Sequence, residues 1–145
     1  MPYIPFRFVH ACNLCLDRQL ADTGPLPEQT HTTVQDATFT AFERVVALCL
    51  DRRADFLLLG GNSFVQHECS VRAQSALVDG LHQLAAAGVR TFVVPGELDP
   101  LPAWRNLSGL PDEVTLLSHS EEPVAVLQDG RVAASIRVMG PEHQS

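Results

Sequence analysis

The chain has 145 residues, 46% of them hydrophobic, so it is long enough to form a core of its own, and this composition argues against a disordered tail. Seventeen acidic and ten basic residues give a formal net charge of −7, which repels nucleic-acid phosphates and disfavours nonspecific nucleic-acid binding. All ten basic residues are arginines, so chemistry that needs a lysine amine is excluded.

The first sixty residues predict a strand, a loop, a helix and a second strand. Residues 6–9 are rich in β-forming side chains and predict the first strand. Residues 17–33 contain glycine and prolines without a hydrophobic period, which is typical of a surface loop. Residues 36–53 repeat apolar side chains at spacings of three to five and predict a helix. The apolar run at 56–59, closed by two glycines, predicts a parallel strand covered on both faces.

The remaining residues predict one more helix, one more strand and a hairpin. Ser70 can cap a helix that ends near Gly88, and residues 91–94 form the next β-type run. Alternating apolar residues on both sides of Asp129-Gly130 predict a β-hairpin with one apolar face. The expected fold class is therefore α/β, with a mixed, mainly parallel sheet, flanking helices and a C-terminal β-hairpin in a single domain over residues 1–145.

Three loops are expected to carry the function, because ligands of open α/β sheets gather at the carboxyl ends of the strands. They are His10–Leu16, Gly60–Phe64 and Pro95–Pro100, and each carries polar residues. Trp104, which follows two prolines, is expected to pack a loop.

These loops and the runs before them resemble the calcineurin-like metallophosphoesterases, and within them the SbcD-type DNA double-strand-break repair exonucleases. The family's motifs are Asp-x-His after strand one, Gly-Asp after strand two, and Gly-Asn-His followed by Asp or Glu after strand three. The matching framework is Phe-Val-His-Ala at 8–11, Ala-Phe-Glu-Arg-Val-Val at 41–46, Ala-Asp-Phe-Leu-Leu-Leu-Gly-Gly at 54–61 and Phe-Val-Val-Pro-Gly at 92–96. The resemblance covers nearly the whole chain and implies the N-terminal half of the family's two-sheet sandwich.

The resemblance also places the family's metal ligands, and most of them are replaced. Members of the family hold two divalent ions, commonly manganese, which activate water and clamp the phosphoryl group. The motif positions are occupied here by Asn13, Cys15, Asn62, Glu97, Leu98 and, as the one retained family residue, Asp99. Two Asp-to-Asn changes remove up to two negative charges from a site for two dications, and a leucine cannot donate a proton. No residue is therefore assigned as catalytic or metal-binding, and no cofactor is expected.

Two functions follow from the resemblance. The first is a catalytically degraded relative of the repair exonucleases that acts as a noncatalytic binding or assembly subunit. The alternative is an active manganese-dependent phosphodiesterase or nuclease, with Glu97, Asp99 and asparagine side chains as ligands and the rest supplied by another chain. The family's later histidine motifs are expected beyond residue 145. Contact with DNA is implied by the resemblance alone.

A third hypothesis rests on the Cys-x-x-Cys formed by Cys12 and Cys15, which could bind zinc together with His10, His67 or Cys69. The spacing alone is a weak signal, because a second such pair is missing from the sequence. The alternative reading is drift from the family's first motif, and the cysteines are expected as reduced thiols.

A protein partner, or self-association, is expected from the half-sandwich. With no second half packed on it, the apolar face of the hairpin would expose roughly several hundred Å², which is more than a monomer usually tolerates. No apolar run approaches the ~20 residues that span a bilayer, and residues 1–5 lack the features of a secretory signal. A cytoplasmic location without membrane contact is the expectation.

Overall fold

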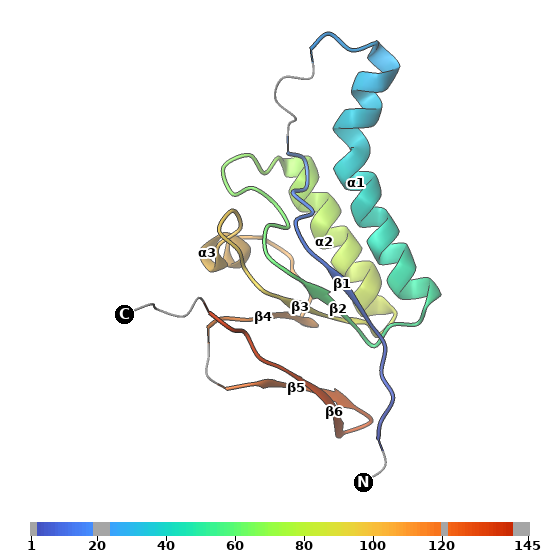
Figure 1. The fold of residues 1–145 in the computed structure, drawn as a ribbon, viewed down its shortest axis with the longest axis vertical. Coiled ribbons are helices and arrows are strands. Elements are labelled where there is room, and N and C mark those ends of the chain that lie inside the picture. Colours follow the sequence, from blue (N-terminus) through green and yellow to red (C-terminus); the bar gives the residue numbers. More distant parts are fainter. Residues whose placement is uncertain (1–2, 19–23, 120–121, 141–145) are drawn as a thin grey trace.

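The computed structural model describes residues 3–18, 24–119 and 122–140, and it shows a parallel sheet between a pair of helices and a hairpin (Figure 1). The sheet has four strands in the order β1-β2-β3-β4, all parallel. Its strands are β1 (Phe8–Ala11), β2 (Phe56–Leu59), β3 (Arg90–Val93) and β4 (Val114–Leu116). The helices are α1 (Glu28–Asp51), α2 (Val71–Ala86) and α3 (Leu101–Arg105), and the antiparallel hairpin is β5 (Val124–Gln128) with β6 (Arg131–Ile136).

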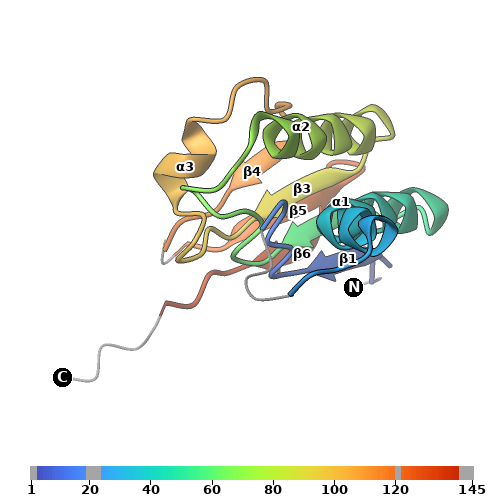
Figure 2. The same cartoon turned by 90° about the horizontal axis from the view of Figure 1, so that it is seen from above.

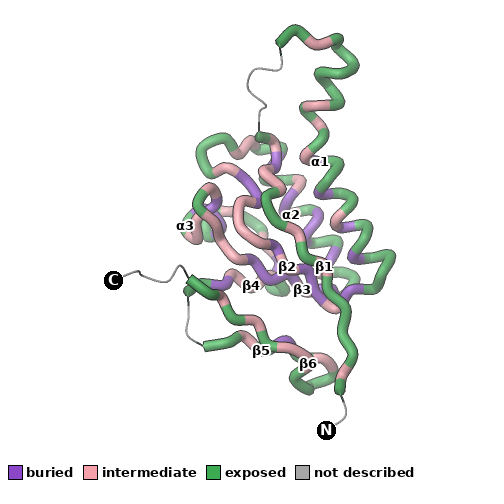
Figure 3. The backbone as a smooth tube through the Cα atoms, viewed as in Figure 1, coloured by how far each residue is buried: buried purple, intermediate pink, exposed green. Residues whose placement is uncertain are grey.

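The alternation of side chains along β2 separates the two apolar layers. Leu57 and Leu59 belong to the larger core, which α1 and α2 complete, whereas Phe56 and Leu58 belong to a smaller core with the hairpin. Successive side chains of a strand point to opposite faces, so one short strand anchors both layers. Figures 2 and 3 show the helices on one face of the sheet and the buried segments concentrated between helices and sheet.

The predicted α/β fold is confirmed, with a parallel sheet, flanking helices and a hairpin at the predicted place. The strand predicted at 56–59 has those bounds, and Ser70 caps α2 by accepting a hydrogen bond from the Ala73 N–H at 3.0 Å. The four-stranded sheet is wholly parallel, because the hairpin forms a separate two-stranded sheet.

Three elements have other bounds than predicted, and the smallest difference is at β3, which spans Arg90–Val93 and not 91–94. Helix α1 begins at Glu28, not at residue 36, so the loop predicted at 17–33 is shorter; its residues 19–23 lie outside the described residues. The first turns of α1 are exposed and protrude beyond the sheet, and a helix segment without a packed face shows no hydrophobic period (Figure 3). The first strand is β1 at 8–11 and not 6–9, since Phe8 pairs with Phe56.

The hairpin does not leave its apolar face bare, which corrects that part of the sequence-based expectation. Val126 is buried with Phe56, Phe92 and Leu117 from the parallel sheet side, and further partly buried side chains join them: Leu58, Val94, Val124, Ala134, Ile136 and Val138. The hairpin is thus itself the cover of this sheet face. Two apolar side chains of the hairpin stay exposed outside this cluster, Val132 at 61% and Leu127 at 47%.

Candidate functional site

The three predicted loops meet at one edge of the sheet, where β1, β2 and β3 end. Backbone pairing continues past the strand ends, because the Asn13 N–H donates to the Gly61 carbonyl at 3.0 Å and the Cys15 N–H to the Asn62 carbonyl at 2.9 Å. The Gln66 N–H donates to the Leu98 carbonyl at 2.9 Å and links the second loop to the third. The structure therefore brings together all three segments that the sequence singled out.

Asp99 is the centre of this loop cluster, and its side chain is completely buried. Its Oδ1 accepts hydrogen bonds from the Asn62 N–H at 2.8 Å and the Gly96 N–H at 2.7 Å. Its Oδ2 accepts from the Ser63 N–H at 2.9 Å and from the Trp104 indole Nε1–H at 3.0 Å. Four donors on two oxygens satisfy the buried group, so Asp99 ties the second and third loops to α3.

The amides of Asn13 and Asn62 form the second link between loops. The Asn62 Nδ2 donates to the Asn13 Oδ1 at 3.0 Å, and the Asn62 Oδ1 accepts from the Leu98 N–H at 3.0 Å. Both asparagines have left-handed backbone, with φ of 53° at Asn13 and 66° at Asn62, a conformation that asparagine tolerates better than most residues. One side-chain amide thus joins all three loops.

Gly61 and Gly96 let the second and third loops approach closely. A Cβ on Gly96 would lie 2.6 Å from the Asn62 Oδ1 and 2.9 Å from the Gly61 Cα, both below any normal contact. A Cβ on Gly61 would meet the Gly96 Cα at 2.9 Å. The two glycines are therefore required by packing, and they hold the Asn62 and Asp99 networks together.

The side chains present do not fit the family's pair of divalent ions. Both Asp99 oxygens already accept two hydrogen bonds each, and the Asn62 Oδ1 accepts one from the Leu98 N–H. Glu97 is exposed and carries the loop's remaining carboxylate. Over residues 3–18, 24–119 and 122–140, no group of three or more His, Cys, Asp or Glu side chains is close enough to hold a metal ion. A hard dication needs several oxygen ligands, but the side-chain oxygens of these loops accept hydrogen bonds from N–H groups of the same loops.

The cysteines are all free thiols. A Cβ on Gly60 would lie 2.8 Å from the Cys12 Cβ and 3.3 Å from the His10 Nε2, so these two side chains lie beside the same glycine. A structural zinc site takes four ligands, and the described residues gather fewer than three. Burial raises the pKa of the Cys49 thiol to about 11, and burial together with the charge of Asp17 raises that of Cys69.

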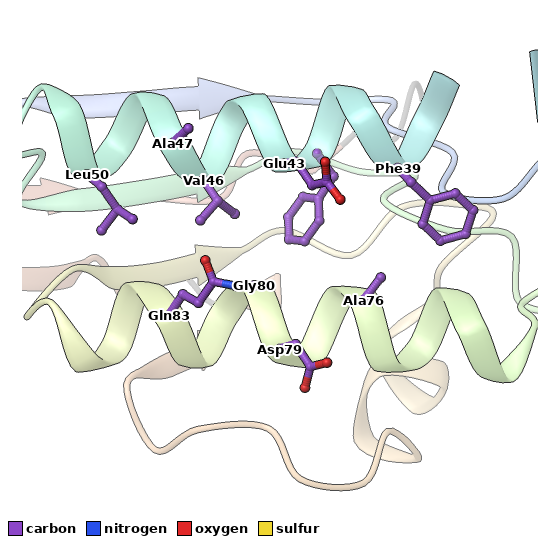
Figure 4. Close-up of a pocket in the computed structure, with 10 residues that line it drawn as sticks. Phe39, Glu43, Val46, Ala47, Leu50, Ala76, Asp79, Gly80 and Gln83 are labelled. Carbon is purple, nitrogen blue, oxygen red and sulfur yellow. The ribbon is translucent and has the colours of Figure 1, made fainter. Parts of the chain in front are cut away.

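A separate groove of about 330 Å³ runs between α1 and α2 (Figure 4). Phe42 and Val46 form its apolar floor, and Gly80 on α2 leaves room for the Phe42 ring, since a Cβ there would lie 2.5 Å from a ring carbon. Glu43 and Asp79 stand on the two facing helices. The groove contains no residue of the three loops, so it is not part of the loop cluster.

Sequence reasoning missed two features of the cluster. Trp104 was expected only to pack a loop, but it lies buried in α3 and donates to Asp99, while its ring contacts Phe64 with centroids 5.2 Å apart. The role of Asp99 was missed because an acidic residue in a loop is normally solvated. A usable signal was the indole five residues after the carboxylate, since a buried tryptophan N–H needs an acceptor.

Comparison with known proteins supports the resemblance at the level of the family. The chain is 28% identical over 130 residues to the uncharacterized metallophosphoesterase YhaO of Bacillus subtilis (strain 168). The match covers 89% of this chain and 32% of that protein, so the chain spans about a third of the length of the curated relative. No family model matches the chain. In the part of the chain that the structure describes, no helix has the length and apolar character to cross a membrane.

Proposed function

We propose that this chain is a metallophosphoesterase-like module that no longer hydrolyses phosphoesters and acts as a noncatalytic binding or assembly unit. The observation that carries the proposal is the loop cluster, in which Asp99 and Asn62 bind neighbouring N–H groups and Asn13. The similarity to YhaO supports the family, and the arrangement of these loops supports the loss of metal chemistry. The likeness to SbcD-type exonucleases, and with it any contact with DNA, belongs to this proposal.

The physical reason is the charge that is left at the strand ends. A two-metal phosphoesterase clamps the attacking and leaving oxygens between two dications, which anionic and imidazole ligands must neutralise. Asn13 and Asn62 are uncharged, Leu98 offers only backbone groups, and Asp99 is enclosed by donors. Glu97 alone is exposed as a carboxylate in the third loop, and one such ligand holds a dication weakly in water.

The direct test is hydrolysis of a model phosphodiester and of single-stranded DNA by the purified chain with millimolar Mn²⁺, alongside calorimetric titration of Mn²⁺. We expect neither turnover nor saturable binding. The decisive variant is Glu97→Gln, because Glu97 is exposed and its replacement leaves the buried network intact; Glu68→Gln, on another exposed carboxylate, is the matched control. Turnover lost in Glu97→Gln but kept in the control would establish the alternative, a manganese-dependent phosphodiesterase.

A gain-of-charge variant tests the same argument from the other side. In the double variant Asn13→Asp, Asn62→Asp the 3.0 Å amide bridge becomes two facing carboxylates. Like charges at that distance repel, so the variant should melt at a lower temperature than the wild type. Mn²⁺ should raise the melting temperature of the double variant and leave that of the wild type unchanged. An equal rise in both proteins would show that the native loops already bind the ion.

A further inference from the structure

The outer edge of β1 is an open edge of the parallel sheet. β1 pairs with β2 on one side, and no strand of the described residues pairs with it on the other. The groups that bond toward β2 belong to odd-numbered residues, because the Arg7 and Ala11 carbonyls accept from the N–H groups of Asp55 and Gly60. Backbone groups alternate in direction along a strand, so the N–H and C=O groups of Phe8 and His10 point to the open edge.

The side chains at this edge are apolar and partly exposed. Phe6 is 40% and Phe8 is 50% exposed, and the Phe8 ring stacks on that of Phe56 with centroids 5.2 Å apart. Leu48 of α1 is 43% exposed and lines a hollow together with Phe6 and Phe8. Natural edge strands usually carry a proline, a charge or a bulge that blocks pairing, and Phe8–Ala11 has neither a proline nor a charged side chain.

Two arginines line this hollow although the chain as a whole is acidic, and one of them, Arg52, also forms an exposed ion pair with Asp51 at 3.7 Å. Arg7 and Arg52 both line the hollow, and the Arg7 guanidinium donates to the Arg52 carbonyl at 3.2 Å. Pairing of two copies through this edge would bring their arginines together and join two chains of net charge −7. The charges thus disfavour a second copy and favour an occupant with a carboxylate.

We propose that the open edge of β1 binds an extended segment of a partner polypeptide as a fifth strand of the sheet. The segment pairs its backbone with Phe8 and His10, places apolar side chains against Phe6 and Phe8, and presents an acidic residue to Arg7 and Arg52. This deepens the proposed function, on which it rests for the role in assembly, by naming the surface and the chemistry of the partner.

The test uses two synthetic ten-residue peptides of alternating valine and threonine, one ending in two glutamates and the other in two lysines. Amide hydrogen exchange of the intact chain is followed residue by residue. The acidic peptide should slow exchange at Phe8 and His10 at least tenfold, and the basic peptide should require at least tenfold higher concentration. Phe8→Lys should abolish the effect, whereas Val71→Lys, which charges a side chain that is 80% exposed at the start of α2, should retain it.

Three outcomes would overturn the proposal. One is no protection of Phe8 and His10 at millimolar acidic peptide, and another is equal protection by both peptides. The third is protection without any peptide, accompanied by a dimeric mass, which would assign the edge to a second copy. Because the readout is amide protection, turnover with Mn²⁺ would contradict the proposed loss of catalysis without affecting this result.

Discussion

The carboxyl-end loops and the open edge of β1 differ in what their polar groups bind. In the loops, the Asp99 carboxyl group and the Asn62 amide bond to donors and acceptors of the same chain. At the edge, the outward backbone groups of Phe8 and His10 have no strand beside them among the described residues. Where the family resemblance points to ligand chemistry, Asp99 and Asn62 bond within the chain, although the buried Ser63 Oγ of the same loops has no hydrogen-bond partner among the described residues. The outward backbone groups of Phe8 and His10 lie on a neighbouring surface of the same sheet.

Asp99→Ala should lower the stability of the protein most, because it removes the acceptor at the centre of the loop cluster. The substitution leaves three backbone N–H groups and the Trp104 indole N–H buried without their acceptor. Each buried donor that loses its partner costs about 1–3 kcal/mol, partly offset by relaxation of the loops, so we expect a loss of about 3–5 kcal/mol. Urea unfolding monitored by fluorescence of Trp104, the one tryptophan of the sequence, measures it.

Asp99→Asn is the matched control for this prediction. It preserves the shape and one acceptor oxygen but turns the other end of the side chain into a donor that faces N–H groups. Its loss of stability should be smaller than that of Asp99→Ala. A stability of Asp99→Ala within about 1 kcal/mol of the wild type would show that the loops are not held by this residue.

Gly96→Ala should lower the stability less than Asp99→Ala, because it crowds the second and third loops without removing a hydrogen-bond partner. The added methyl group would lie 2.6 Å from the Asn62 Oδ1 and 2.8 Å from the Asn62 backbone nitrogen. Overpacking of this kind costs about 1–3 kcal/mol. The same unfolding experiment measures it, with Ser108→Ala on an exposed position as the control. An unchanged midpoint would contradict the close approach of the two loops.

Asn62→Gly separates the side-chain bridge from the backbone conformation. Glycine adopts the φ of 66° without strain, so the loss reflects the hydrogen bonds to Asn13 and Leu98. We expect about 1–2 kcal/mol of destabilisation in urea unfolding. The two neutral hydrogen bonds contribute about 0.5–1.5 kcal/mol each and glycine adds entropy to the unfolded chain, while release of the left-handed strain at Asn62 offsets part of the loss. Asn106→Gly, at an exposed residue after α3, measures the entropic part alone. Equal losses in both variants would show that the side-chain hydrogen bonds of Asn62 do not stabilise the fold.

The elements that could be predicted from the sequence are those with a buried apolar face. Continuous or periodic apolar runs predicted β2, α2 and the hairpin, because these elements bury one or both faces. The exposed first turns of α1 and the three-residue strand β4 lack such a pattern and were missed. The motif framework located all three loops, but the enclosure of Asp99 depends on donors up to 37 residues away in the chain, which no local pattern records.

Phe8→Thr, at the open edge of β1, should have the smallest effect on stability. Threonine keeps a high strand propensity, and the ring that is removed is half exposed and contacts Phe6 and Phe56 on one side. A half-exposed ring contributes far less than the roughly 3–5 kcal/mol of a buried one, so we expect under about 1 kcal/mol in urea unfolding. Phe42→Thr, at a buried ring of α1, is the contrasting variant and should lose several times more. Comparable losses at both positions would show that the Phe8 ring is part of the core of this chain. It would then not be available to contact a partner strand at the edge.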